Sequence, residues 1–169
     1  MNENLPNITL REATCDDSSA LFEWRNDLQT REMSKDTELI DISSHSEWLS
    51  QVIGDFNRIL LIAELNGSAI GVTRFDLNKE SKDVNVSINL NPEFRGLGLS
   101  SPMLMNSINY ILARNQWILL LKAEVNIRNQ ASKRIFARNG FVLDSNNQTS
   151  STFEKYLKEI RGGNPLLNQ

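Results

Sequence analysis

A short glycine-containing stretch, residues 91–102 (NPEFRGLGLSSP), constrains the fold more than any other part of the chain. Residues 83–90, directly before it, alternate strictly between polar and apolar side chains, the pattern of a strand with one buried face. After it, leucine and isoleucine recur at helical spacing over residues 104–112. The stretch is therefore expected to join a strand to a helix, with Ser101 as the N-cap and Pro102 as the first helical residue.

The predicted turn has the features of an anion-binding site. Gly96 and Gly98 carry no Cβ that would block an anion from the backbone N–H groups, and the helix start adds partial positive charge. Arg95 places a full positive charge beside them, so a phosphate or diphosphate is the expected ligand. Neither the dinucleotide spacing G-x-G-x-x-G nor a P-loop is present. What remains is Arg-x-x-Gly-x-small, at Arg95, Gly98 and Ser100.

Length and charge bound the class of protein. The 169 residues suffice for one domain and are too few for two ordinary ones, so a single domain over 1–169 is expected, with its core at about 7–157 and a flexible tail at 162–169. The hydrophobic fraction of 40% and the charged fraction of 23% are typical of soluble globular proteins. A net charge of −3 implies no general attraction to nucleic acid or to an anionic membrane.

The cysteine count and the hydropathy restrict the chain further. Cys15 is the single cysteine, which excludes an internal disulfide and a cysteine-based metal cluster, and no metal is expected. The sequence has no run of 18 apolar residues, and its N-terminus is polar rather than signal-like. A cytoplasmic location is therefore expected.

Periodicity and turn residues predict the order of the elements. A helix starting with the capping box at Ser44 and Glu47 follows an irregular region at 27–42, and Asn66-Gly67 is a strong hairpin signal. Strands are expected at 8–11, 58–65, 68–76, 83–90, 118–125, 141–143 and 152–157, and helices at about 16–26, 44–53, 101–115 and 129–139. The order β-α-α-β-β-β-α-β-α-β-β predicts a mixed α+β fold with helices on both faces of a mixed sheet.

A second motif lies near the C-terminal end, in residues 125–141 (VNIRNQASKRIFARNGF). It has the form Asn-x-x-Ser-x-x-x-Phe-x-x-x-Gly-Phe, beginning at Asn129. With the glycine stretch and the element order, this motif makes residues 7–157 resemble the GNAT (GCN5-related N-acetyltransferase) family. The family fold is a three-layer αβα sandwich around a mixed, mostly antiparallel sheet. The chain departs from the family loop at Ser100, where a glycine or alanine is usual.

The resemblance implies acetyl-CoA as co-substrate. Its diphosphate would lie in the glycine stretch, and its pantetheine arm would pair with the edge of a fourth strand that splays from the fifth. The residues implied for these contacts are Ile88, Leu90, Arg95, Gly96, Gly98, Leu99, Ser100, Asn129, Phe136 and Arg138. Asn129 could also be only a helix cap, and Arg138 only a solvated surface charge.

Acetyl transfer to an amine needs a group that accepts a proton and a source of a proton for the departing thiolate. Glu124 is at the position where some family members have a catalytic glutamate, so it is the candidate base; a carboxylate without a chemical role is the alternative. Phe136 is at the position where many members have a proton-donating tyrosine, which it cannot replace. Water, another side chain or the amine's own proton must then protonate the sulfur.

The first third of the chain bears on the acceptor. WRND at 24–27, Thr30-Arg31 and SHSEW at 44–48 resemble acetyltransferases of nucleotide-linked amino sugars, notably those of the pseudaminic acid pathway. The implied acceptor contacts are Trp24, Arg25, Arg31, His45 and Trp48, although the tryptophans could be core residues and the histidine a structural hydrogen-bonder.

The expected function is acetyl-CoA-dependent acetylation of a small-molecule amine, with a nucleotide-linked amino sugar as the best candidate. A protein N-terminal acetyltransferase and a non-catalytic acetyl-CoA-binding module are the alternatives. A homodimer is among the possible assemblies.

Overall fold

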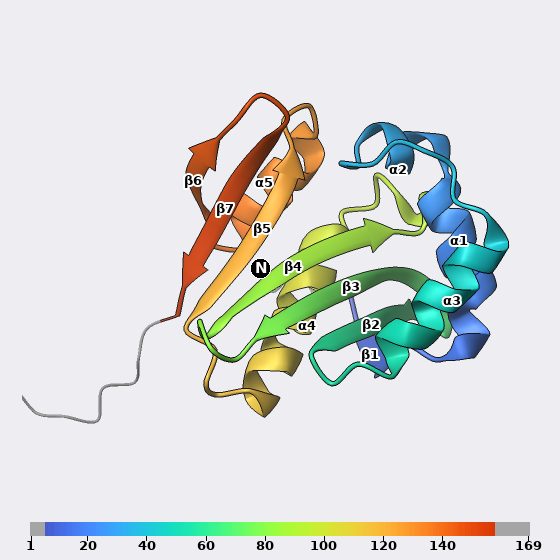
Figure 1. The fold of residues 1–169 in the computed structure, drawn as a ribbon, viewed down its shortest axis with the longest axis horizontal. Coiled ribbons are helices and arrows are strands. Elements are labelled where there is room, and N and C mark those ends of the chain that lie inside the picture. The colour runs from blue at the N-terminus through green and yellow to red at the C-terminus, as the bar shows by residue number, and fades with distance from the viewer. Residues whose placement is uncertain (1–5, 158–169) are drawn as a thin grey trace, which may run out of the picture.

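The structure, a computed structural model, describes residues 6–157, and the tail expected at 162–169 lies outside them. One seven-stranded sheet has the order β1-β2-β3-β4-β5-β7-β6, and all neighbours are antiparallel except β4 and β5, which are parallel (Figure 1). The strands are Ile8–Glu12 (β1), Arg58–Leu65 (β2), Ser68–Asn78 (β3), Asp83–Leu90 (β4), Leu120–Asn126 (β5), Val142–Asn146 (β6) and Ser150–Tyr156 (β7). The helices are Ser18–Asn26 (α1), Leu28–Glu32 (α2), Ile42–Ile53 (α3), Ser100–Arg114 (α4) and Gln130–Arg138 (α5).

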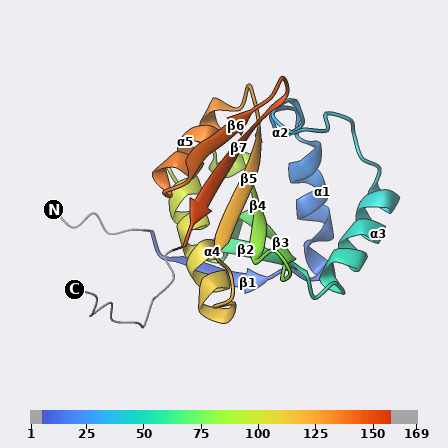
Figure 2. The same ribbon diagram turned by 60° about the vertical axis from the view of Figure 1, so that its left-hand side comes forward.

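Helices cover both faces of the sheet, so the expected three-layer mixed α+β architecture is confirmed (Figure 2). Alternation along β2 divides the core between the two faces. Leu60 and Ile62 pack with α1 and α3, whereas Leu61 packs with α4 and α5. Among the described residues, no helix is long and apolar enough to cross a membrane.

The hairpin predicted from Asn66-Gly67 is confirmed. Leu65 pairs with Ser68 across the turn. Asn66 and Gly67 have φ of 53° and 81°, the left-handed values that a two-residue type I′ turn requires. The turn fixes the register of β2 and β3, and with it which side chains reach each face.

The region expected to be irregular, 27–42, contains the short helix α2, and this expectation was wrong. Asp27 caps α2 by accepting a hydrogen bond from the Thr30 backbone N–H at 2.9 Å. The helix has only five residues, too few to show a periodic apolar pattern.

Two predicted helix starts also differ from the structure. Helix α3 begins at Ile42 rather than at Ser44, because Asp41 is the N-cap and accepts from the Ser44 N–H at 2.9 Å. Helix α4 begins at Ser100, so Pro102 is the third helical residue instead of the first. Proline is tolerated there because the first-turn N–H groups have no intrahelical partner.

Candidate functional site

Strands β4 and β5 separate after a short paired segment (Figure 1). Their parallel ladder has three residue pairs, from Asp83–Leu120 to Asn85–Lys122. Beyond it, β4 continues to Leu90 and β5 to Asn126 without pairing with each other. The backbone of residues 86–90 therefore has a free edge toward β5 inside the molecule, at the position where the family resemblance implies a splay.

A cavity of about 800 Å³ lies at this separation. Residues from β4, the glycine stretch and α5 line one part, called here the cofactor half: Ser87, Ile88, Asn89, Leu90, Arg95, Gly96, Ser100, Asn129, Ala131, Ser132 and Ile135. The part beside α1, α3, β2 and β3, called here the acceptor half, is lined by Leu21, Arg25, Ile40, Ser44, His45, Trp48, Leu60, Val72 and Arg74. Gln29, Thr30, Met33, Ser34 and Asp36 line the region between the halves.

The glycine stretch presents unpaired donors at one end of the cofactor half. Gly96 and Gly98 have φ of 77° and 74°, and a Cβ added to either would meet no atom within 4 Å. None of the backbone N–H groups of residues 96–99 donates to a carbonyl oxygen of the described chain. Leu99, the N-cap of α4, provides no side-chain cap. These open donors at a helix start fit a diphosphate group.

Arg95 links the glycine stretch to α2. Its Nη2 donates to Asp27 Oδ2 at 2.6 Å and to Thr30 Oγ1 at 2.7 Å, and its Nη1 donates to Gln29 Oε1 at 3.2 Å. The hydrogen bond from Arg95 lowers the pKa of Asp27. A guanidinium has five N–H donors, so Nε and one Nη1 hydrogen are left for a ligand.

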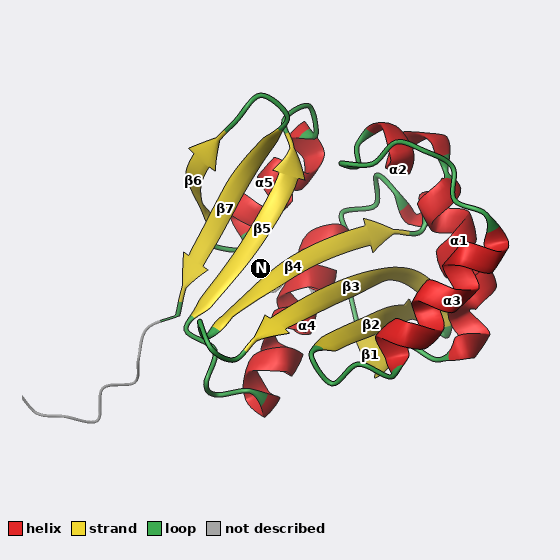
Figure 3. Ribbon diagram, in the orientation of Figure 1, coloured by secondary structure: helices red, strands yellow, loops and turns green. Residues whose placement is uncertain are grey.

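Residues 27–41, called here the strap, cross from the glycine stretch to β5 above the separated strands (Figures 1 and 3). On the β5 side, Asn126 Nδ2 donates to Ser34 O at 2.8 Å, and Lys35 Nζ lies 3.3 Å from Glu124 Oε2. On the β4 side, Thr30 Oγ1 donates to Asn89 Oδ1 at 3.4 Å. The strap therefore bridges both sides of the splay and forms the boundary between the halves of the cavity.

Glu124, the candidate base, does not line the cavity. It lies on β5 with its side chain 47% exposed, and it accepts a hydrogen bond from Ser150 Oγ at 2.8 Å. The Ser150 hydrogen bond and, to a lesser degree, Lys35 lower the pKa of Glu124. A lowered pKa makes this carboxylate a weaker proton acceptor.

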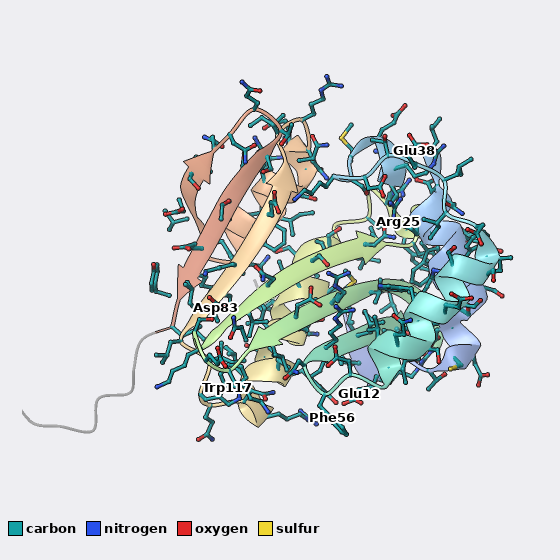
Figure 4. All side chains as sticks on the ribbon, in the orientation of Figure 1. Glu12, Arg25, Glu38, Phe56, Asp83 and Trp117 are labelled. Carbon is teal, nitrogen blue, oxygen red and sulfur yellow. The ribbon has the colours of Figure 1, made fainter. Side chains whose placement is uncertain are left out.

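Arg25 presents an unpaired donor in the acceptor half. Its Nη2 donates to Asp36 O at 3.0 Å, whereas its Nη1 is buried without a hydrogen-bond partner among the described residues. Figure 4 shows Arg25 near the end of β4, below the strap that carries Glu38. A buried N–H of a charged group is costly to leave unpaired, so this position fits an anionic ligand group.

His45 and Trp48 also line the acceptor half, as expected. His45 Nε2 lies 3.0 Å from Ser18 O, and since a carbonyl only accepts, Nε2 carries the hydrogen. Burial lowers the pKa of His45, which keeps the ring neutral at pH 7. His45 therefore makes a structural hydrogen bond and also lines the cavity.

Several predicted site residues lie outside the cavity. Trp24 is 5% exposed and packs in the core with α3 and β2, and Arg31 donates to the carbonyls of Asn26 and Thr37, so neither faces the acceptor half. The remaining ones were predicted to bind the cofactor: Gly98, exposed in the glycine stretch; Leu99, in the core; Phe136, buried edge-to-face against Phe141; and Arg138, at a separate small hollow beside Lys155. Asn129 does line the cavity and also caps α5.

Two charged cavity residues were missed. Arg74 lies on β3 two residues before the charged Asp76, and a charged strand residue is usually expected at the exposed surface. Asp36 belongs to the strap, which has no motif. Arg74 follows Val72, which lines the cavity, by two residues on the same strand, and this spacing is the one sequence signal that could have placed Arg74 on the cavity face.

The sequence matches the family model described as acetyltransferase (GNAT) domain over residues 7–142. No curated protein matches it significantly. The fold is similar to that of a spermidine N-acetyltransferase from Vibrio cholerae in complex with CoA and spermine, with a TM-score of 0.79 and 15% identity over 88% of this chain and 95% of that one. It is also similar to RimL, a ribosomal α-N-protein acetyltransferase in complex with coenzyme A (TM-score 0.77, 17% identity, 89% and 94% covered). An aminoglycoside acetyltransferase in complex with coenzyme A is a further neighbour (TM-score 0.76, 17% identity, 89% and 95% covered).

Proposed function

The chain belongs to the acetyltransferase (GNAT) domain family, and from this premise we propose that it acetylates a small amine that also carries negative charge. A nucleotide-linked amino sugar is the best candidate for that amine. The acetyl donor is acetyl-CoA, and the chain is an N-acetyltransferase of the acyltransferase class.

The charge of the cavity carries the proposal about the acceptor. Within residues 6–157, three arginines line the cavity, Arg25, Arg74 and Arg95, against a single carboxylate, Asp36. Arg74 and Arg95 are paired with Asp76 and Asp27, so Arg25 is the cation whose charge would oppose a polyamine, which is cationic at every nitrogen. An acceptor with a phosphate or diphosphate would instead give the buried Nη1 of Arg25 the partner that it lacks.

The shape and lining of the acceptor half support the same class. Trp48 and Val72 offer apolar surface to a sugar or a base, while Arg25 and Arg74 come from two different elements around it. Arg74 is already paired with Asp76 Oδ2 at 2.6 Å, so Arg25 is the stronger candidate for the anion.

The cofactor half supports acetyl-CoA binding through this chain's own groups. The free edge of β4 at residues 86–90 can hydrogen-bond to the amides of the pantetheine arm as a neighbouring strand would. The N–H groups of residues 96–99, with Arg95, would hold the diphosphate. The β4 edge, Arg95 and Gly96 line one cavity with the acceptor half, so the two reactants can be held together.

The test compares acceptors in an assay of CoA thiol release. The panel contains a UDP-linked amino sugar with a free amine, the uncharged glucosamine, spermidine, and a peptide with a free N-terminus. The expected result is release with the nucleotide-linked sugar well above release with the other three. Preference for the peptide would favour a protein N-terminal acetyltransferase, and binding of acetyl-CoA without release for any amine would favour a non-catalytic module.

Variants of Arg25 test the physical reason. Arg25→Met should lower kcat/KM for the nucleotide-linked sugar about 10- to 100-fold, because a charge-assisted hydrogen bond contributes about 1.5–3 kcal/mol. Arg25→Lys should recover part of that loss. Arg114→Ala, which removes an exposed charge outside the cavity, is the matched control. An unchanged kcat/KM in Arg25→Met would contradict the assigned anion contact.

A further inference from the structure

Among the residues that the structure describes, Asp36 is the one carboxylate that lines the cavity. Its Oδ1 accepts a hydrogen bond from the Glu38 backbone N–H at 3.0 Å, which fixes the orientation of the side chain. Its Oδ2 accepts no hydrogen bond within the described chain, and no ion pair involves the residue there. One carboxylate oxygen is thus held in place while the other is available to a ligand.

The contacts on either side place Asp36 at the boundary between the two halves of the cavity. The preceding residue, Lys35, pairs with Glu124 on β5. The carbonyl of Asp36 itself accepts from Arg25 Nη2 at 3.0 Å, which ties it to α1 in the acceptor half. Acetyl transfer must occur at such a boundary, because the thioester comes from the cofactor half and the amine from the acceptor half.

We propose that Asp36 binds the ammonium group of the acceptor and accepts the proton that this group loses before it attacks. The assignment rests on the proposed function, and it replaces Glu124, which lies outside the cavity, in the role of base. Asp36 and Arg25 together then recognise a zwitterionic acceptor, with the carboxylate at the amine and the guanidinium at the anionic group. The hydrogen bond from Arg25 to Asp36 O keeps these two groups at a fixed separation.

The proton and electron balance of the step is complete. The ammonium group gives one proton to the Asp36 carboxylate, and the free nitrogen attacks the carbonyl carbon of the thioester to form the C–N bond. The C–S bond then breaks, and the second proton of the nitrogen goes to the departing sulfur. Asp36 is exposed, so it can pass its proton to solvent, which accounts for the one proton released per turnover.

Other charged groups belong to the strap near Asp36 or hydrogen-bond to it. They are Arg25 of α1, Arg31 of α2, whose Nη1 donates to Thr37 O at 3.0 Å, and Lys35, which is paired with Glu124 of β5. Within the described chain, none of these cations bonds to the Asp36 carboxylate, so its Oδ2 stays available for the ammonium group of the acceptor. Glu38, two residues after Asp36, is the strap carboxylate nearest to it along the chain, and Glu38 does not line the cavity.

The experiment measures kcat/KM against pH with the UDP-linked amino sugar as acceptor. Asp36→Asn keeps an oxygen for the Glu38 N–H but has no charge and no basic group. It should lose about 10²- to 10⁴-fold in kcat/KM at neutral pH, and the loss should shrink at higher pH as the amine deprotonates in solution. Glu38→Gln, an equal change of charge two residues away, should stay within about twofold of the wild type, and so should Glu124→Gln.

A CoA titration by calorimetry separates this role from a structural one. Asp36→Asn should bind CoA with the wild-type dissociation constant, because the cofactor half is unchanged. Asp36→Asn with wild-type turnover at neutral pH, or a loss of rate equal in Glu38→Gln, would overturn the assignment alone. A wild-type enzyme that releases no CoA with the sugar would overturn the proposed acceptor and this inference together.

Discussion

Replacing Gly98 with valine tests where the diphosphate binds. Gly98 has φ of 74°, a value that a β-branched residue adopts only with strain, and the space around its Cα is open. Valine would therefore do two things: strain or refold the turn, and place methyl groups where an anion must approach the N–H groups of residues 96–99. The structure provides a control for the first effect. Gly67, in the hairpin turn between β2 and β3, has φ of 81° and equally open space.

The two variants should lose similar stability and differ in ligand affinity. A left-handed conformation costs an L-residue about 1–2 kcal/mol, so both Gly98→Val and Gly67→Val should unfold at lower urea concentration by that amount or somewhat more. In Gly98→Val, one or more charge-assisted hydrogen bonds to the diphosphate should also be lost. At about 1.5–3 kcal/mol for one such bond, the dissociation constant of CoA should rise roughly 10- to 100-fold.

The assay is isothermal titration of CoA into each variant, after urea unfolding has confirmed that both are folded. Gly67→Val should bind CoA like the wild type, because its turn belongs to the β2–β3 hairpin and not to the glycine stretch whose N–H groups are open to the diphosphate. Wild-type affinity in a folded Gly98→Val protein would refute the reasoning, and so would an equal loss of affinity in both variants, which would trace the effect to stability instead of to the site.

Two further predictions concern the residues around the site. Arg95 lowers the pKa of Asp27 in the folded protein. The ion pair should therefore stabilise the fold fully above the unfolded pKa of 3.8, and this stabilisation should disappear as the pH falls through the lower folded pKa. Urea unfolding of the wild type and Asp27→Asn from pH 6 to pH 3 should give a difference in the free energy of unfolding that shrinks toward acid, and a difference independent of pH would contradict the ion pair. Because Trp24 is a core residue, Trp24→Ala should lower the free energy of unfolding by about 3–5 kcal/mol and leave the CoA affinity of the folded fraction unchanged. Weakened sugar binding with unchanged stability would instead indicate that Trp24 contacts the acceptor.

The sequence predicted the parts of the fold that depend on local patterns. The alternation over 83–90 identified β4 with its correct bounds, and Asn66-Gly67 identified the β2–β3 hairpin. In both cases the neighbours along the chain carry the signal, since a strand with one buried face must alternate and a type I′ turn needs two left-handed residues. The splay of β4 from β5 followed from family resemblance and not from any local pattern.

The candidate site could be predicted only in part, because its missing residues depend on contacts between distant segments. The strap has no apolar period, and its place is fixed by single hydrogen bonds to side chains far along the chain, such as Asn126 to Ser34. Arginine and tryptophan are residue types that suit a ligand site, yet Arg31 hydrogen-bonds to two backbone carbonyls and Trp24 packs in the core. Asp36 was not predicted, since nothing near it in the sequence distinguishes it from the other strap carboxylates.

The free edge of β4 has a consequence for the protein without its ligand. Unpaired N–H and C=O groups along a strand are a template for pairing with another chain, a hazard that proteins usually limit by covering the edge. Here residues 86–90 cannot be covered permanently, because the same groups are needed for the pantetheine arm. A ligand at 100 times its dissociation constant stabilises the folded state by about 2.7 kcal/mol, in addition to occupying this edge. Because this edge faces the cavity inside the molecule, the supply of acetyl-CoA in a cell would thus govern how far the folded state is stabilised as well as how fast the protein works.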